Sequence, residues 1–444
     1  MTGFHSGRRV ALVGRYPERD PALPPYIPNL GLYQVAAAVR NAGFDDLDLR
    51  IWDFPEKPVK DVIAEIEAFD PDVIGFSAYV WSLPALMEIN AALKATDPAR
   101  LSIFGGPSAR ANMLAHVPFA QMTQPDVLVI GEGEGAMTEL VALKRREPET
   151  LRHVRGIALR EGAGWKQTPP RHPAILDQLA SPYADGLMPQ TGLAIMETYR
   201  GCPFTCSFCE WGVMDAPKNV RSVASISDEF AAIADNGRRT LLLVDAGLNL
   251  NKPAFTNLAQ AAEETGFLKN RNLICEVYPA KVRDEHLKFL DGVGSPHIGV
   301  GLQSFDSDVL DEVQRKYDEA RFNAILGDLR SVASLAIEII VGLPGDSPEK
   351  FRRNFARARA LPYALRVYHC LVLPSALMQR SPPEHALDYD PVTLKMRSCL
   401  GWSRESLAET VEFINEEAAK DGGLPGEFFW VFPSPQSSGR ARAS

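Results

Sequence analysis

The sequence predicts a two-domain α/β protein in which a doubly wound, flavodoxin-like domain precedes a partial (β/α)6 barrel and a short helical C-terminal region. Three observations predict this fold class. Short apolar runs alternate with helical patterns, a proline-bearing stretch divides that alternation into two series, and 444 residues suffice for two or three domains with full-sized cores. The expected boundaries are 1–150 for the first domain, 151–190 for a linker, 191–385 for the barrel and 386–444 for the C-terminal region.

The first series of expected strands lies before residue 150. Its strands are apolar throughout and are separated by helical patterns, which is typical of a parallel sheet covered on both faces. Five strands suffice for a flavodoxin-like sheet. They are Val10–Gly14, Leu47–Trp52, Val73–Ser77, Leu101–Phe104 and Val127–Ile130.

The loops after these strands are expected to form one rim, because ligands of doubly wound sheets bind beyond the carboxyl ends of the strands. Trp81 follows the third expected strand, and Gly105 and Gly106 follow the fourth. Glycine permits positive φ and the close approach of a ligand, although glycines also end strands for structural reasons alone. Trp81, Gly105 and Gly106 are therefore candidate ligand-binding residues, with a structural role as the alternative.

The second series follows a polar stretch that contains Pro169, Pro170, Pro173 and Pro182. Six strands alternating with helices predict a partial parallel barrel, whose catalytic groups should sit at the carboxyl ends of the strands. The tail Ser434–Ser444 lacks the apolar content to fold. The six strands are Leu193–Thr198, Thr240–Val244, Leu273–Val277, Ile298–Gln303, Ala336–Val341 and Leu365–Leu373.

Composition excludes several classes of protein. The formal net charge of -9 comes from dispersed acidic residues, and no basic tract suits a phosphate backbone, so nucleic acid is not an expected partner. No apolar stretch approaches the roughly 18 residues that span a bilayer. The apolar run after Arg8 and Arg9 is too short for a signal-peptide core, so a cytoplasmic location is expected.

Three of the six cysteines, Cys202, Cys206 and Cys209, crowd into one short loop just after the first barrel strand. Their positions at i, i+4 and i+7 bring soft ligands together. A structural zinc site usually takes four protein ligands, and no fourth cysteine or well-spaced histidine lies near. An iron–sulfur cube with one open iron fits better. The remaining cysteines are scattered, as small buried hydrophobes usually are.

This CxxxCxxC spacing resembles the signature of the radical S-adenosylmethionine (SAM) superfamily. The resemblance implies a [4Fe-4S] cluster on the three cysteines, with SAM at the fourth iron site, reductive cleavage of SAM to a 5′-deoxyadenosyl radical, and hydrogen abstraction from a substrate. Phe208 also matches the family pattern, in which that ring lies near the adenine. An electron donor is implied as a partner: a flavodoxin, a ferredoxin or a dedicated reductase.

The same resemblance implies further positions near SAM. Asp245 closes the second barrel strand near the expected SAM amino group, but the family's usual two glycines and acid are absent, so Asp245 could equally touch substrate. Gln303 ends strand four, Arg315 lies where a basic side chain could meet the SAM carboxylate, and Gly342 opens a turn near adenosine. Glu276 is a further candidate, and a solvated helix surface is the alternative for Arg315.

Ionisable residues near the expected strand ends provide candidate proton donors and acceptors. The catalytic candidates are Glu210, Asp245 and Lys281, and Glu197 lies in a similar position. Each of them also fits a structural role.

The N-terminal domain resembles the cobalamin-binding domain of B12-type radical SAM enzymes. The resemblance rests on the segments Pro28–Tyr33, Ile74–Ser77 with Trp81, Phe104–Pro107 and Gly131–Glu134. It implies cobalamin as a possible third cofactor. No Asp-x-His-x-x-Gly motif is present, so no histidine ligand to cobalt is expected.

Two reactions on a small natural-product-type substrate follow from the resemblance. Family frequency favours cobalamin-dependent C-methylation, and a short C-terminal region after residue 374 favours the alternative. That alternative is a cobalamin-independent 1,2-diol dehydration or rearrangement of an amino-sugar (aminoglycoside-type) substrate, similar to the radical SAM diol dehydratase of apramycin biosynthesis. A cofactor-dependent sensor is a third reading, but a sensor does not need an open iron.

Overall fold

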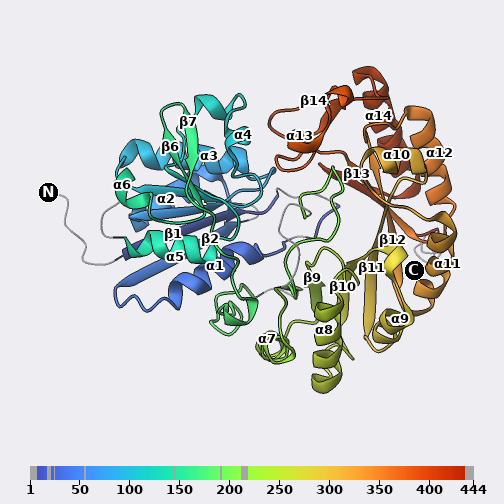
Figure 1. The fold of residues 1–444 in the computed structure, drawn as a ribbon, viewed down its shortest axis with the longest axis horizontal. Coiled ribbons are helices and arrows are strands. Elements are labelled where there is room, and N and C mark those ends of the chain that lie inside the picture. The colour runs from blue at the N-terminus through green and yellow to red at the C-terminus, as the bar shows by residue number, and fades with distance from the viewer. Residues whose placement is uncertain are drawn as a thin grey trace. The chain divides into compact units, whose positions relative to one another are not determined.

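The computed structural model describes residues 8–17, 22–24, 26–54, 57–143, 147–190, 193–211 and 219–435. The chain divides into two compact units, the first centred on Pro25–Gln190 and the second on Thr191–Asp390 and Leu394–Ser444 (Figure 1). Most of the expected tail, from residue 436 onward, lies outside the described residues. Among the described helices, none is both long and apolar enough to cross a membrane.

The first unit contains a seven-stranded sheet in the order β2-β1-β3-β4-β5-β6-β7. Strands β1 to β5 are parallel, and their order 2-1-3-4-5 confirms the flavodoxin-like prediction. The elements are β1 (Arg8–Arg15), α1 (Leu30–Arg40), β2 (Leu47–Phe54), α2 (Val59–Phe69), β3 (Val73–Ser77), α3 (Leu83–Thr96), β4 (Leu101–Gly105), α4 (Ala111–Leu114), β5 (Val127–Val129), α5 (Glu134–Ala142), α6 (Pro148–Leu151), β6 (Ile157–Glu161) and β7 (Gly164–Gln167).

Helices cover the first sheet, so its central strands are buried on both faces. Val10 to Val13 of β1 are at most 1% exposed, and Val10 and Leu12 pack in a core with residues of α1 and α5. The continuous apolar run Val10–Val13 is therefore buried on both faces of the sheet.

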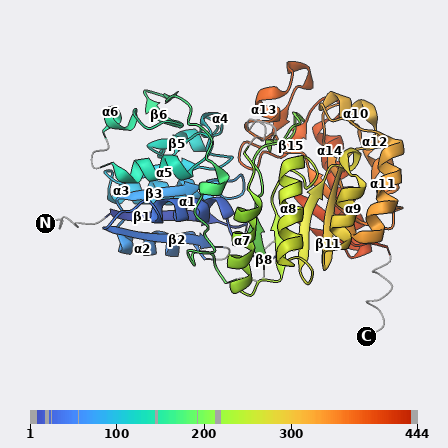
Figure 2. The ribbon, with the colours of Figure 1, turned by 60° about the horizontal axis from the view of Figure 1, so that its bottom comes forward.

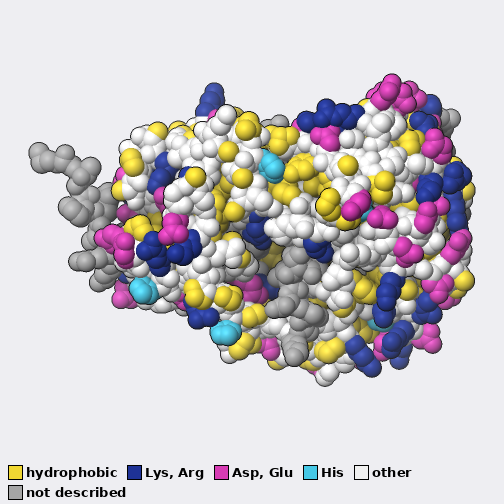
Figure 3. All heavy atoms as spheres, turned by 45° about the horizontal axis from the view of Figure 1, so that its top comes forward, with side chains coloured by type: hydrophobic (Ala, Val, Ile, Leu, Met, Phe, Trp, Pro, Cys, Tyr) yellow, Lys and Arg dark blue, Asp and Glu magenta, His cyan; other side chains and the backbone are white. Residues whose placement is uncertain are grey.

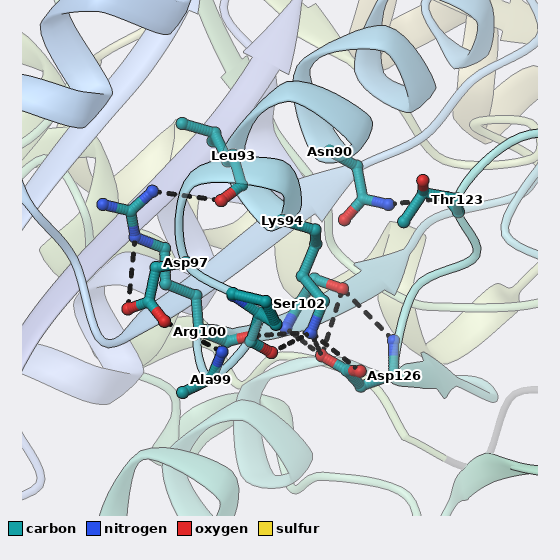
Figure 4. Close-up of polar contacts among 10 residues, drawn as sticks. Asn90, Leu93, Lys94, Asp97, Ala99, Arg100, Ser102, Thr123 and Asp126 are labelled. Carbon is teal, nitrogen blue, oxygen red and sulfur yellow. Dashed lines mark hydrogen bonds and ion pairs between the residues drawn. The ribbon is translucent and has the colours of Figure 1, made fainter.

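A polar cluster fastens the amino ends of β4 and β5, the edge opposite the ligand-type loops (Figure 4). Lys94, near the end of α3, donates to Asp126 Oδ2 at 2.9 Å and to the carbonyl of Arg100 at 3.0 Å. Asp126 in turn accepts the backbone N–H of Ser102 at 2.8 Å. These contacts join α3 to β4 and β5 at the amino ends of the two strands, and the ligand-type loops lie at the opposite, carboxyl ends.

The second unit contains an eight-stranded sheet in the order β16-β17-β13-β12-β11-β10-β9-β8. Strands β8 to β13 are parallel neighbours in chain order, which confirms the expected six β/α units of a partial barrel. The parallel series comprises β8 (Leu193–Met196), α7 (Val223–Asp235), β9 (Thr240–Leu243), α8 (Lys252–Thr265), β10 (Asn272–Val277), α9 (Asp284–Asp291), β11 (Ser295–Gln303), α10 (Ser307–Glu312), α11 (Glu319–Val332), β12 (Ser334–Val341), α12 (Pro348–Arg359) and β13 (Ala364–His369).

The rest of the second unit follows β13. Helices α8, α9 and α11 run along one side of the sheet (Figure 2), and α14 contacts both α12 and β17. The remaining elements are α13 (Leu377–Arg380), β14 (Asp388–Tyr389), β15 (Met396–Ser398), α14 (Arg404–Asp421), β16 (Leu424–Pro425) and β17 (Phe429–Phe432).

The structure differs from the expectations at both domain edges. Residues expected in a linker form the hairpin β6–β7, and β6 extends the first sheet by pairing antiparallel with β5. The side chains of β7 are mostly exposed, so it carried no apolar signal. The C-terminal region, expected to be helical, also contributes strands, because aromatic β17 pairs antiparallel with β13 and packs Trp430 and Phe432 into the core.

Charged side chains of both signs are interspersed on the face of the molecule shown in Figure 3. This pattern agrees with the dispersed charge of the sequence.

Candidate functional site

The three clustered cysteines lie in the loop after β8, at the carboxyl edge of the second sheet. Cys206 is buried, Cys202 and Cys209 are half-buried, and none forms a disulfide. Burial raises the pKa of Cys209 to about 11 and raises that of Cys202, and the three thiols add to the effect by repelling one another as thiolates. The sulfurs are therefore close enough to interact, and the nearby Arg315 offsets only part of the rise in pKa.

Hydrogen bonds prepare these sulfurs to act as ligands. Cys202 accepts the backbone N–H of Phe204, and Cys209 accepts that of Trp211. Arg315 places Nη1 3.9 Å from the Cys206 sulfur. N–H groups directed at sulfur are characteristic of iron–sulfur sites, so the residues present fit such a cluster. Within the described ranges, no three His, Cys, Asp or Glu side chains are grouped closely enough to hold a single metal ion.

Asp245 follows β9 and is fully enclosed. Its carboxylate accepts the backbone N–H and the hydroxyl of Thr198, at 2.7 and 2.5 Å, and more distantly the N–H of Tyr199 at 3.4 Å. Burial raises the pKa of Asp245 to about 7, against the opposing effect of these hydrogen bonds. The carboxylate thus fastens the end of β8, immediately before the cysteine loop, which favours a positioning role over contact with substrate.

The other catalytic candidates are separated from one another. Glu210 accepts the backbone N–H of Ser375 at 2.8 Å, so its carboxylate joins the cysteine loop to the segment after β13. Glu197 forms a bidentate ion pair with Arg200, with a shortest contact of 2.7 Å. Lys281 is exposed on the turn after β10. Each of these ionisable groups thus has contacts of a different kind.

Gln303 and Arg315 converge over Gly301 on β11. Gln303 has φ of 74° at a register shift between β11 and β12, and Arg315 donates to the carbonyl of Gly301. A Cβ added at Gly301 would lie 2.8 Å from Gln303 Nε2 and 3.2 Å from Arg315 Nη2. A side chain at this position would therefore have to displace the polar ends of Gln303 and Arg315.

Aromatic rings line the neighbouring part of the site. Phe204 stacks on Tyr278 with ring centroids 4.5 Å apart, and Arg315 lies 4.9 Å from the Tyr278 ring centroid. Phe208, the expected adenine neighbour, is half-buried in the same loop. The aromatic contacts of Phe204 and Tyr278 were not predicted from the sequence, because their pairing depends on the fold.

A charged network occupies the strands beside Gly301. Arg366 donates to Glu338 at 3.1 Å and lies 3.8 Å from Glu276, and Tyr368 donates to Glu338 at 3.1 Å. Burial, then the neighbouring Glu338, raises the pKa of Glu276 well above its usual range. Yet 41% of the Glu276 side chain is accessible, so it is not enclosed in the packed core.

Glu276 was predicted from the sequence, but the other three members of this network were not. Glu338 lies within the otherwise apolar strand Ser334–Val341, and Arg366 and Tyr368 lie on alternate positions of β13. A charged residue within an apolar strand could have indicated this network, because a buried charge without a partner would be costly and therefore implies one nearby.

Gly342 follows β12 and has φ of 87°. Its carbonyl lies 3.6 Å from the sulfur of Cys399, and an added Cβ would lie 3.4 Å from Leu407 of α14. The turn is thus held by the C-terminal region.

In the first unit, Trp81 and the two candidate glycines lie at the carboxyl edge of the sheet. Trp81 stacks on Tyr79 with centroids 4.6 Å apart, donates to the carbonyl of Arg15 at 3.2 Å, and keeps 37% of its surface exposed. Gly106 has φ of 94°, and an added Cβ would lie 2.7 Å from the carbonyl oxygen of Ala78. Gly105 has no such constraint, since the nearest atom would be 3.8 Å away.

A polar cluster at the same edge was not predicted. Asp53, at the end of β2, accepts the hydroxyl of Tyr26 at 2.6 Å and the backbone N–H of Asn29 at 2.9 Å. Asn29 also donates to Ser77 at 3.0 Å. Burial raises the pKa of Asp53. These contacts join the loop before α1 to the ends of β2 and β3.

Comparison with known proteins identifies two domain families in the chain. The B12 binding domain matches residues 22–141, and the radical SAM superfamily matches residues 196–358.

Two curated relatives are methyltransferases from bacteria. The 2-(S-pantetheinyl)-carbapenam-3-carboxylate methyltransferase of Streptantibioticus cattleyicolor is 28% identical over 392 residues, which cover 79% of this chain and 54% of the relative. The cobalamin-dependent radical SAM methyltransferase TokK of Streptomyces tokunonensis is 28% identical over 393 residues, with the same coverages of 79% and 54%. The chain thus spans about half the length of these relatives.

A solved structure shares the fold across nearly the whole chain. The radical SAM methyltransferase TsrM from Kitasatospora setae, solved with cobalamin and a [4Fe-4S] cluster bound, superposes with a TM-score of 0.64 at 18% identity. The match covers 97% of this chain and 84% of TsrM.

Proposed function

Because the chain joins a B12-binding domain to a radical SAM domain and is an enzyme of that type, we propose that it C-methylates a small natural-product-type molecule. Its cofactors are a [4Fe-4S] cluster, SAM and cobalamin. When bound, the cluster and SAM supply a 5′-deoxyadenosyl radical that abstracts a substrate hydrogen, and cobalamin supplies the methyl group.

The observation that carries this proposal is the arrangement of the cysteine loop. Cys202, Cys206 and Cys209 interact with one another, two of them accept backbone N–H groups, and a guanidinium lies beside the third. In this proposal the three thiolates hold the cluster, and Phe208 lies on the adenine side of SAM.

The chain's own residues then position SAM and the substrate. Arg315 and Gln303, held together over Gly301, bind the polar end of SAM, and the turn at Gly342 borders its adenosine. The network of Glu276, Glu338, Arg366 and Tyr368 faces the substrate in this proposal, since the Glu276 carboxyl group is accessible while its raised pKa reflects a partly desolvated setting.

The catalytic candidates take different roles in this proposal. Asp245 and Glu210 position the cysteine loop from its two sides, through Thr198 and Ser375 respectively. Exposed Lys281 is the remaining candidate for proton transfer, because its side chain is free to move toward a bound substrate.

Cobalamin is assigned to the carboxyl edge of the first sheet. Trp81 offers an exposed aromatic face there, and the strand ends at Gly105 and Gly106 form the neighbouring loop. A loop of this kind is where doubly wound sheets bind their ligands.

Methylation is favoured over the alternative dehydration of an amino-sugar. Both curated relatives are methyltransferases, and neither supports dehydration. In the sequence, the short C-terminal region favoured dehydration. This argument is weaker now, because the match to the methyltransferase TsrM covers 84% of the TsrM chain. We further propose a flavodoxin, a ferredoxin or a dedicated reductase as the electron donor.

Anaerobic reconstitution with iron, sulfide and hydroxocobalamin tests the proposal. After desalting and addition of SAM and reductant, the chain should retain about one cobalt per cluster and form both S-adenosylhomocysteine and 5′-deoxyadenosine. The first product reports methylation of cobalamin, and the second reports radical formation. Iron with 5′-deoxyadenosine but without cobalt or S-adenosylhomocysteine would contradict methyl transfer.

A further inference from the structure

The segment after β13 contacts the cysteine loop through one arginine. Arg380 ends the short helix α13, which Pro382 and Pro383 prevent from continuing. Its Nη1 donates to the carbonyl of Thr205 at 3.2 Å, and its Nη2 donates to the carbonyl of Cys209. One guanidinium thus bridges two carbonyls on either side of Cys206.

The segment that carries Arg380 is itself anchored on both sides. Before it, the backbone N–H of Ser375 donates to Glu210 of the cysteine loop at 2.8 Å. After it, His385 is 1% exposed and connects Ser381 at 2.6 Å to Glu312 of α10 at 2.7 Å. Because contacts fix the chain on both sides of Arg380, its guanidinium is pre-organised at the cysteine loop.

Among the described residues, no acidic side chain forms an ion pair with Arg380. Within that part of the chain, its Nε is also buried without a hydrogen-bond partner. Arg315, on the Cys206 side, likewise contacts a sulfur and a carbonyl rather than a carboxylate. Two guanidinium groups therefore lie at a loop that would carry negative thiolates.

We propose that Arg380 is a positioning residue that bridges the cysteine loop and favours the reduced state of its cluster. The inference rests on the proposed function, because it assumes that Cys202, Cys206 and Cys209 bind a [4Fe-4S] cluster. One-electron reduction makes such a cluster one unit more negative, and nearby positive charge and hydrogen bonds set its potential. Arg380 supplies the charge and spans the loop.

Two substitutions separate the charge from the bridge. Arg380→Gln removes the positive charge and is too short to reach both carbonyls. Arg380→Lys keeps the charge but lacks the planar set of N–H donors with which the guanidinium bridges the two carbonyls. Arg404→Gln is the matched control, because Arg404 is 67% exposed and pairs with Asp388 of the same unit at 2.6 Å. Each full-length chain is reconstituted with iron and sulfide alone.

The readouts are iron retained after exposure to a chelator and the cluster's midpoint potential in a dithionite titration followed by electron paramagnetic resonance. We expect Arg380→Gln to lose iron severalfold faster and to shift the potential to more negative values. Arg380→Lys should lose iron faster while its potential stays near that of the original chain. Arg404→Gln should change neither quantity.

An unchanged potential in a folded Arg380→Gln chain overturns the inference and leaves the proposed function standing. If Arg380→Gln does not fold, as circular dichroism would show, Arg380→Lys decides, and iron retention equal to the original chain overturns the inference. Failure of the unsubstituted chain to assemble a cluster overturns the proposed function itself. The two failures are therefore distinguishable without measuring methyl transfer.

Discussion

Asp245 accepts two hydrogen bonds from Thr198, one from the backbone N–H at 2.7 Å and one from the hydroxyl at 2.5 Å. The two residues follow the carboxyl ends of neighbouring parallel strands, β9 and β8, and Thr198 precedes Cys202 by only a few residues. An enclosed carboxylate with these partners orients the backbone that leads to Cys202.

The first prediction separates this role from direct catalysis. Asp245→Ala should reduce cluster loading severalfold, because it leaves buried N–H groups unsatisfied at about 1–3 kcal/mol each. Asp245→Asn should restore most of the loading and of 5′-deoxyadenosine formation, since the Thr198 hydroxyl can rotate to suit an amide. Iron content and product yield are the measurements. A residue that needs its negative charge for SAM or substrate would instead fail as Asn.

The fold was largely predictable from sequence because its strongest signals are local. Apolar runs such as Val10–Val13 and Val73–Phe76 are buried on both faces, and burial of that kind leaves a continuous pattern. Strand β7 was missed because its side chains face solvent, and β17 was missed because its partner β13 lies far away in sequence.

The candidate site was predictable only where chemistry requires a fixed spacing. The three cysteines have such a spacing. The contact between Arg366 and Glu338 instead joins two strands whose register cannot be predicted from the sequence. The same holds for Arg380, whose carbonyl partners precede it by more than 170 residues in each case. Cross-strand partners become visible only when the barrel is assembled.

The second prediction concerns the three cysteine ligands. Replacing Cys202, Cys206 or Cys209 singly with Ala should abolish iron–sulfur absorbance and 5′-deoxyadenosine formation, since each thiolate binds one iron of the cluster. Cys275→Ala is the control, because Cys275 is buried within β10 and lies outside the cysteine loop. Full activity in any of the three variants would refute the assignment.

The third prediction uses the crowding at Gly301. Gly301→Ala should weaken SAM binding about tenfold, or about 1.4 kcal/mol, because the new methyl group would displace Gln303 and Arg315. Gly327→Ala is the matched control, since nothing lies within 4 Å of an added Cβ in helix α11. Equilibrium binding of SAM to reconstituted protein checks both. Equal affinity in Gly301→Ala and the original chain would count against a SAM site over Gly301.

The fourth prediction concerns Trp81 in the first unit. Trp81→Ala should lower cobalamin retention about tenfold, because it removes the exposed ring that stacks on Tyr79. Substitution at Gly106 is a poor test, since any side chain there meets the Ala78 carbonyl and disturbs the loop. Trp165→Ala, on β7, is the control. Cobalt counts after desalting decide, and equal retention in all three proteins would exclude Trp81 from the cobalamin site.

The fifth prediction concerns the pH dependence of stability that Glu276 creates. Burial, and after it the neighbouring Glu338, raises the pKa of Glu276 in the folded protein. The resulting stabilisation is complete when the pH is below the unfolded-state pKa near 4.5, and it is lost as the pH rises through the higher folded-state pKa. Glu276→Gln mimics the protonated form and can still donate to Glu338. Its melting temperature should therefore exceed that of the original chain at alkaline pH, by about 2–4 °C for each 1 kcal/mol, and match it at acidic pH. Exposed Glu409→Gln should leave the profile unchanged, and a parallel profile for Glu276→Gln would mean that Glu276 is ionised in the folded protein.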